Sequence, residues 1–135
     1  MNLSGLIANI HWIPVMVMTV FSFALGAFWH TGFMFGKTWS AENNADKARL
    51  KAKTPMIFGG TAIMHFLAIA GTGAIAAGTG AMNGLTAGFL ISVVWMLPAM
   101  TGTYLFADRS LKLLAIDAGM YIVLFSVTGL ILGIW

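Results

Sequence analysis

The sequence has no cysteine and very little charge, and each of these shortages excludes a class of protein. Without cysteine, the chain cannot form a disulfide, a thiolate metal site or a cysteine nucleophile. Charged residues make up 8% of the 135 positions, against roughly 25% in ordinary soluble domains. Hydrophobic residues make up 59%. So few charges cannot cover the surface of a soluble domain of this size, and we therefore predict an integral membrane protein.

Long charge-free intervals predict an all-α, polytopic membrane protein with four membrane-spanning helices in an antiparallel bundle. A span needs about 20 apolar residues, and an open sheet edge is not viable in lipid. We treat residues 1–135 as a single transmembrane domain, with spans at about residues 10–33, 55–77, 85–106 and 111–134.

Three local signals refine this topology. The stretch "GTGAMNG" (78–84) predicts a tight turn, because glycine and asparagine accept backbone angles that helices refuse. Ser40 is expected to cap a short helix in the first polar loop. Pro98 should kink the third span and release the carbonyl of Val94, to which Thr101 or a water could then donate.

All seven Lys and Arg residues fall in two basic loops, 37–53 and 107–112. By the positive-inside rule, both loops face the cytoplasm and both termini lie outside, as expected for a multi-pass protein of the bacterial inner membrane. The same clustering explains the net charge of +3 without nucleic-acid binding. We expect interface anchors, by indole preference for the headgroup zone or by lysine snorkelling, at Trp12, Trp29, Lys37, Trp39 and Trp135.

Ionisable side chains inside the spans are the candidate functional residues, because they are costly in lipid. His30 and Asp117 lie at similar depths from the basic loops. Tyr104 lies on the third predicted span, 85–106. We predict a possible intramembrane polar cluster of His30, Tyr104 and Asp117, which Arg109 and Lys112 could join. The alternative is that Asp117 caps, or is neutralised by, the neighbouring basic loop.

His65 lies near the middle of the second predicted span. One interpretation is a neutral histidine hydrogen-bonded to a hydroxyl or a carbonyl. The other is an axial ligand to haem or a chlorophyll-type pigment, although no cofactor is predicted. The sequence has no zinc-ligand spacing, phosphate loop or Gly-x-Ser-x-Gly elbow, so we expect neither a metal site nor an enzyme.

Small residues recur at helical spacing and predict tightly packed helices. They form the pair Gly84 and Gly88, the pair Gly129 and Gly133, and a stripe of Ala70, Ala74 and Gly78. Such stripes let helix backbones approach closely, either within the chain or in a homo-oligomer.

Two stretches resemble the DUF1761 family of small bacterial membrane proteins. "LGAFWHTGFMFGKTW" resembles the end of that family's first helix, and "YLFADRSLKLLAIDAGMYIVLFSVTGLILGIW" its C-terminal segment. The resemblance implies four membrane helices and names no activity. The matching positions are Gly26, Trp29, Phe35, Gly36, Lys37, Trp39, Phe106, Arg109, Ser110, Leu111, Lys112, Asp117, Ala118 and Gly119. His30 stands where the family pattern has tyrosine, which suggests a hydroxyl-like hydrogen-bonding role.

Three functional hypotheses follow. The first is a non-enzymatic protein that acts in the bilayer by assembly, as a homo-oligomer or an accessory subunit of a larger membrane complex. The second is a small carrier or channel that handles a proton or an unknown small solute at His30, Tyr104 and Asp117. The third is haem or pigment binding through His65.

Overall fold

The computed structural model describes residues 2–44 and 46–135, and every regular element in these residues is helical. The elements are α1 (Leu3–Ala8), α2 (Trp12–Trp29), α3 (Gly36–Asn43), α4 (Lys47–Ala52), α5 (Thr54–Ala76), α6 (Ala81–Leu90), the π-helix η1 (Ile91–Met96), α7 (Leu97–Phe106) and α8 (Leu111–Ile134).

Four helical segments of the described residues are long and apolar enough to cross a membrane, which confirms the expected number of spans. They are α2, α5, the continuous run of α6, η1 and α7 (Ala81–Phe106), and α8. The last three lie within four residues of the expected bounds. The first is shorter than expected because α2 begins at Trp12 and residues 30–35 leave the helical path.

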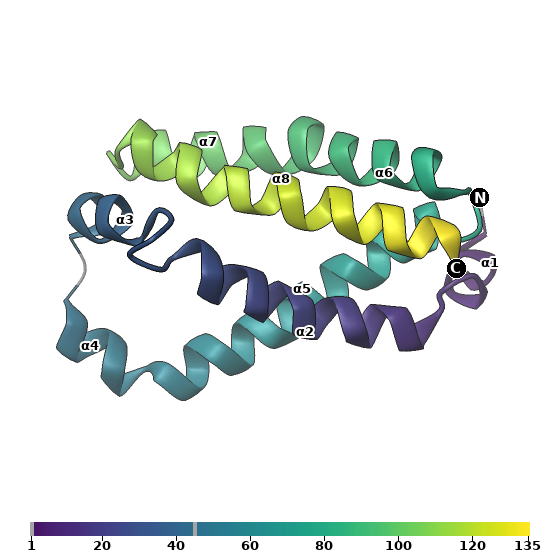
Figure 1. Cartoon of the computed structure of the whole chain (residues 1–135), viewed down its shortest axis with the longest axis horizontal. Helices are drawn as coiled ribbons and strands as arrows, with labels where there is room; N and C mark the ends of the chain where they lie inside the picture. Colours follow the sequence, from purple (N-terminus) through teal and green to yellow (C-terminus); the bar gives the residue numbers. More distant parts are fainter. Residues whose placement is uncertain (1, 45) are drawn as a thin grey trace.

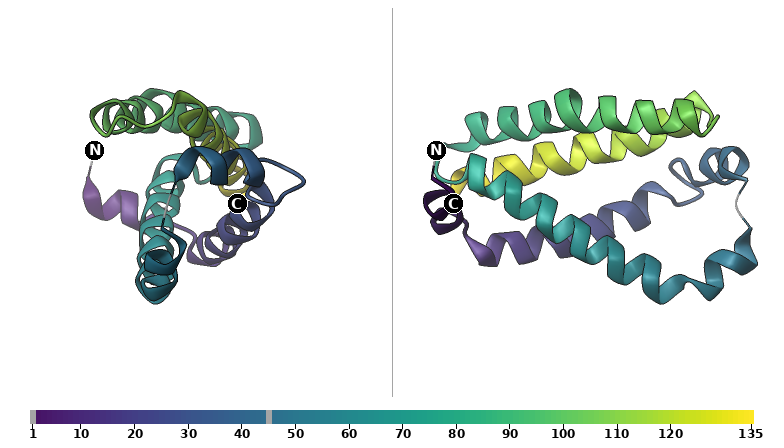
Figure 2. Two further views of the ribbon diagram at one scale, coloured as in Figure 1. Left: turned by 90° about the vertical axis from the view of Figure 1, so that its left-hand side faces the viewer. Right: turned by 180° about the vertical axis from the view of Figure 1, so that it is seen from behind.

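The basic loops and the chain ends lie at opposite ends of the molecule (Figure 1). α3 and α4 occupy one end, here called the basic-loop end, whereas both termini mark the other, here called the terminal end. α8 runs beside α6 and α7, and α2 and α5 cross on its other side (Figure 2). Toward the basic-loop end, α5 diverges from α7 and α8.

Glycines bring α6 and α8 into backbone contact. A Cβ on Gly84 would collide with the carbonyl of Gly129, and one on Gly88 would collide with the carbonyl of Phe125. At the terminal end, the amide of Gly80 donates to the carbonyl of Gly133, 2.9 Å away. Along these contacts, the residue numbers rise in α6 and fall in α8, so the two helices are antiparallel. The glycine pairs are therefore used inside the chain, which removes their support for a homo-oligomeric contact.

An apolar core closes the terminal half between α2, α5 and α8. Val15, Met18, Ile69, Ala70 and Leu132 form one buried cluster, in which Val15 and Ile69 have no exposed surface. The core thus holds the three helices together on the side away from the basic loops.

Two local predictions are wrong. Ser40 lies inside α3, and the cap in this loop is Asp46, whose carboxylate accepts from the amides of Ala48 and Arg49 at the start of α4. Thr101 donates to the carbonyl of Leu97, not to that of Val94. The residues before Pro98 form the π-helix η1, so the hydrogen-bond register changes just where the proline ring would meet an α-helical carbonyl.

The predicted turn between the second and third spans is present, but it is shorter than expected. Gly78 and Gly80 have φ angles of +70° and +91°, which favour glycine. Asn83 lies inside α6, where its side-chain amide donates to the carbonyl of Thr79.

Candidate functional site

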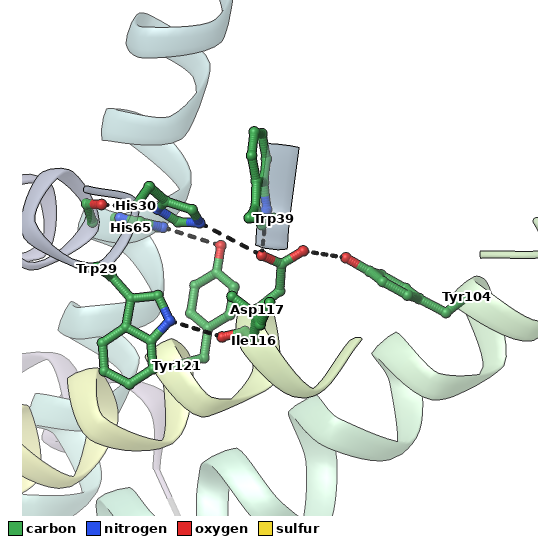
Figure 3. Close-up of polar contacts among 9 residues, drawn as sticks. Trp29, His30, Trp39, His65, Tyr104, Ile116, Asp117 and Tyr121 are labelled. Atoms are coloured by element: carbon green, nitrogen blue, oxygen red, sulfur yellow. Dashed lines mark hydrogen bonds and ion pairs between the residues drawn. The ribbon is translucent and has the colours of Figure 1, made fainter. Parts of the chain in front are cut away.

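Asp117 on α8 is the centre of a polar cluster at the basic-loop end (Figure 3). The indole N–H of Trp39 donates to its Oδ1 at 2.9 Å, and the hydroxyl of Tyr104 donates to its Oδ2. His30 Nε2 lies 3.6 Å from Oδ1. The Asp117 side chain is only 17% exposed. Residues of α3, α7 and the end of α2 thus converge on one carboxylate, and the structure brings His30, Tyr104 and Asp117 together.

The chain reversal between α2 and α3 carries Trp39 to Asp117. In this reversal, the amide of Gly36 donates to the carbonyl of Thr31 at 2.9 Å, and the amide of Phe35 donates to that of Trp29. A Cβ on Gly36 would collide with the carbonyl of His30. Only glycine allows this close approach, which starts α3 where Trp39 faces α8.

Trp29 binds a second point on α8. Its indole N–H donates to the carbonyl of Ile116 at 3.0 Å. The ring lies against Gly119, where an added Cβ would be 3.4 Å from Cζ2. Trp29 and Trp39 were expected only as interface anchors, yet both direct their N–H groups to α8. Anchoring at the membrane surface stays a prediction for these two and for Trp12, Lys37 and Trp135.

His30 leaves one ring nitrogen facing the carboxylate without a hydrogen bond. Its Nδ1 lies 2.8 Å from the carbonyl oxygen of Gly26, and a carbonyl can only accept, so Nδ1 carries a proton. Nε2 is buried and has no hydrogen-bond partner in the described residues. At 3.6 Å it is too far from Asp117 Oδ1 for a direct hydrogen bond. A neutral ring would set two acceptors against each other. A proton added at Nε2 would make the contact an attractive ion pair, and a small donor such as water could hydrogen-bond to both atoms.

The loop cations contribute less to this cluster than expected. The guanidinium carbon of Arg109 lies 5.5 Å from the centre of the Tyr104 ring, so Arg109 reaches Asp117 only through tyrosine. Lys112 directs its ammonium to Glu42, at 3.9 Å. Within the described residues, the side chains that contact the Asp117 carboxylate are Trp39, Tyr104 and His30. Neutralisation of Asp117 by the neighbouring loop, the alternative to a cluster, is therefore not what the geometry supports.

His65 on α5 has partners for both ring nitrogens. Ser22 donates its hydroxyl to the carbonyl of Thr19 at 2.6 Å, so its oxygen accepts from His65 Nδ1, 2.8 Å away. His65 Nε2 then accepts from the Tyr121 hydroxyl, 3.4 Å away. This is the pattern of a neutral imidazole bonded to two hydroxyls. Haem or pigment ligation through Nε2 would require the Tyr121 contact to break.

Two cavities flank the His30–Asp117 pair. The inner cavity, about 320 Å³, has a mostly apolar lining, and the polar residues in that lining are Ser22, His30, Thr61, His65 and Tyr121. The outer hollow, about 570 Å³, is bordered by the polar side chains of Asn43, Lys51, Thr54, Arg109 and Asp117. Ile57 and Phe58 line both. A pair of apolar side chains thus separates a hollow at the basic loops from a cavity that reaches His65.

Sequence reasoning missed Ser22, Trp39 and Tyr121 as members of the polar site. Tyr121 could have been found, because it lies one helical turn after Asp117 and so shares its face of α8. Trp39 depends on the reversal at residues 30–35, for which the sequence offers only Gly36. No group of three or more histidine, aspartate or glutamate residues in the described chain could hold a metal ion.

The four long apolar helices indicate a membrane protein. The family DUF1761, described as a protein of unknown function, matches residues 13–133. The chain belongs to this family, as the resemblance of its two motifs predicted. No curated protein and no solved structure matches it.

Proposed function

We propose that the protein is a small, non-enzymatic carrier that handles a proton or a small solute at the His30–Asp117 pair. The observation that carries this proposal is the buried Nε2 of His30, which faces the Asp117 carboxylate 3.6 Å away without a hydrogen bond. Ionisable groups inside a span are costly and usually functional. A pair that is completed only by an added proton or donor group is a binding site for that group.

The orientation in the membrane belongs to this proposal. We place the four spans as an antiparallel bundle in the bacterial inner membrane, with the basic loops in the cytoplasm and both termini outside. The outer hollow then opens toward the cytoplasm, and the buried core around Val15, Ile69 and Leu132 closes the opposite side. The described conformation is thus accessible from the cytoplasm and closed from outside, which is one of the two states that alternating access requires.

Assembly with itself or a larger complex ranks second. The small-residue stripes were the main argument for assembly. The glycine pairs of α6 and α8 are buried in the contact between these two helices, so they are not free to contact a partner. The short loops and the lack of a catalytic motif also favoured assembly. The apolar outer surface, where Trp95 and Phe106 are 67% and 99% exposed, is a further argument for it. Lipid covers such a surface as well as a partner protein does.

Proton flux into proteoliposomes loaded with a pH-sensitive dye tests the proposal. With an imposed potassium diffusion potential, the wild-type chain should acidify the lumen faster than empty liposomes. Asp117→Asn should lower the protein-dependent rate by at least about tenfold, since a positioned proton-transfer group contributes that much or more. His30→Phe should lower it comparably.

Asp108→Asn is the matched control. It removes the same charge from an exposed loop position at φ 51°, a conformation that asparagine accepts. Its flux should equal that of the wild type. A wild-type rate equal to that of empty liposomes, or one unchanged in Asp117→Asn, would contradict proton handling.

A further inference from the structure

The outer hollow has a feature that proton handling at Asp117 does not require. Two cations, Lys51 on α4 and Arg109 in the loop before α8, line the same hollow. Both side chains belong to exposed residues, so their charges lie at the rim. Segments that are distant in sequence therefore present two positive charges to one opening.

The carboxylate in this hollow is already engaged. Asp117 is only 17% exposed, and both of its oxygens accept hydrogen bonds, from Trp39 and from Tyr104. These donors hold the carboxylate in place but leave its charge, so an incoming anion would bind at the rim cations rather than beside Asp117. The rim is thus cationic and the interior carboxylate is covered by donors.

The remaining wall suits a ligand with an apolar part. Leu50, Ile57 and Phe58 also line the hollow, and they are 40%, 38% and 59% exposed. The residues that line the hollow belong to the basic-loop end of the molecule. At this end, α5 diverges from α7 and α8 (Figure 2). In a bilayer, this is the level of the phospholipid headgroups.

We propose that the outer hollow binds a phosphate-type anion through Lys51 and Arg109, and that its source is the headgroup of an anionic phospholipid. Basic hollows between spans on the cytoplasmic side are suited to such headgroups. The phosphate lies between the two cations, and the acyl chains leave along Ile57 and Phe58. This site does not depend on proton handling, because Asp117→Asn leaves both cations in place.

Native mass spectrometry of the full chain tests the proposal with equal amounts of phosphatidylglycerol and phosphatidylcholine that carry the same acyl chains. The wild type should retain phosphatidylglycerol in preference by about tenfold or more, on the scale expected for two cations near one headgroup. In Lys51→Gln/Arg109→Gln, the preference should fall to about parity.

The control double variant is Lys37→Gln/Lys53→Gln, which removes the same charge from exposed lysines that do not line the hollow. It should keep the preference. Equal losses in both double variants would overturn the site, because net charge alone would then explain binding.

A second arm separates a lipid from a soluble anion. Glycerol 3-phosphate is added to the detergent-solubilised chain without phospholipid, and thermal unfolding is followed. Protection that requires Lys51 and Arg109 would assign the hollow to a soluble phosphate ester, whereas protection by phosphatidylglycerol alone assigns it to the lipid. Protection by neither, together with parity in the wild type, would overturn the anion site altogether.

Discussion

At the residue scale, the decisive feature is which way the two ring nitrogens of His30 point. His30 commits Nδ1–H to the carbonyl of Gly26, and its Nε2 is left facing Asp117. His65, deeper in the same inner cavity, has partners on both nitrogens. The two histidines therefore differ in kind. One completes a hydrogen-bond network, and the other marks the place where a further proton or donor is bound.

Trp39→Phe tests whether Trp39 holds Asp117. The change keeps the aromatic ring but removes the N–H that donates to Oδ1. We expect the free energy of unfolding to fall by about 1–2 kcal/mol, because the buried carboxylate loses the hydrogen bond to one of its two oxygens. Unfolding in a mixed-micelle denaturant titration measures the change. Trp95→Phe, at a position 67% exposed, should be close to neutral; equal effects at the two positions would exclude the hydrogen bond as the cause.

Single residues of the site were predictable where their chemistry is costly in lipid. His30, Tyr104 and Asp117 stood out because ionisable groups inside spans need partners. Lys112 was misassigned because its direction depends on Glu42, which the separately folded α3 places beside it. The role of Trp39 was also hidden, because the path of residues 30–35 cannot be read from apolar periodicity.

At the element scale, contact between α6 and α8 depends on glycine. Gly88→Ala should lower the free energy of unfolding by about 1–3 kcal/mol, the usual cost of overpacking, because the new Cβ collides with the Phe125 carbonyl. Gly102→Ala, in the same span but with nothing within 4 Å, is the control. It should be neutral or stabilising by up to about 1 kcal/mol, because alanine favours helix. A Gly88→Ala chain as stable as the control would refute the close approach.

The reversal between α2 and α3 makes a second prediction. Gly36→Ala should displace α3 and lower stability by about 1–3 kcal/mol, because the added Cβ meets the His30 carbonyl. That displacement also removes Trp39 from Asp117. In a double-mutant cycle, the variant with both Gly36→Ala and Trp39→Phe should therefore lose less stability than the sum of the two single losses.

Gly32→Ala provides the comparison within the same reversal. Its Cβ would lie 3.8 Å from the Lys37 side chain, an ordinary contact. This variant should combine additively with Trp39→Phe. Full additivity for Gly36→Ala as well would mean that Gly36 does not position Trp39.

The spans themselves were predictable because a charge-free interval of span length has few alternatives. The start and end of α8 agree with the sequence-based bounds of 111 and 134. Local details were less accessible. The π-helix before Pro98 and the Asp46 cap depend on competition between hydrogen-bond partners that apolar patterning does not report. The glycine pairs did predict a close approach, but the sequence could not say whether the partner was internal.

At the scale of the whole molecule, the two ends differ. The terminal end is closed by a packed core, whereas the basic-loop end opens into the outer hollow and, past Ile57 and Phe58, toward the inner cavity. This asymmetry links the charge pattern of the loops to the polar groups inside the spans. The carrier proposal depends on one claim, that the described conformation is open toward the cytoplasmic side.

Cysteine accessibility tests that claim most directly, because the native chain has no cysteine and each introduced thiol is unique. Thr61→Cys places a thiol in the inner cavity, and Ile63→Cys places one on the same helix at a position 59% exposed outside it. With a small, charged, membrane-impermeant thiosulfonate, the account predicts that Thr61→Cys reacts faster in inside-out vesicles than in intact cells, because the described conformation opens only toward the basic loops. Ile63→Cys should react in neither, since lipid surrounds it. Thr61→Cys that reacts faster in intact cells than in inside-out vesicles, or that reacts in neither, would contradict a cavity open to the cytoplasm.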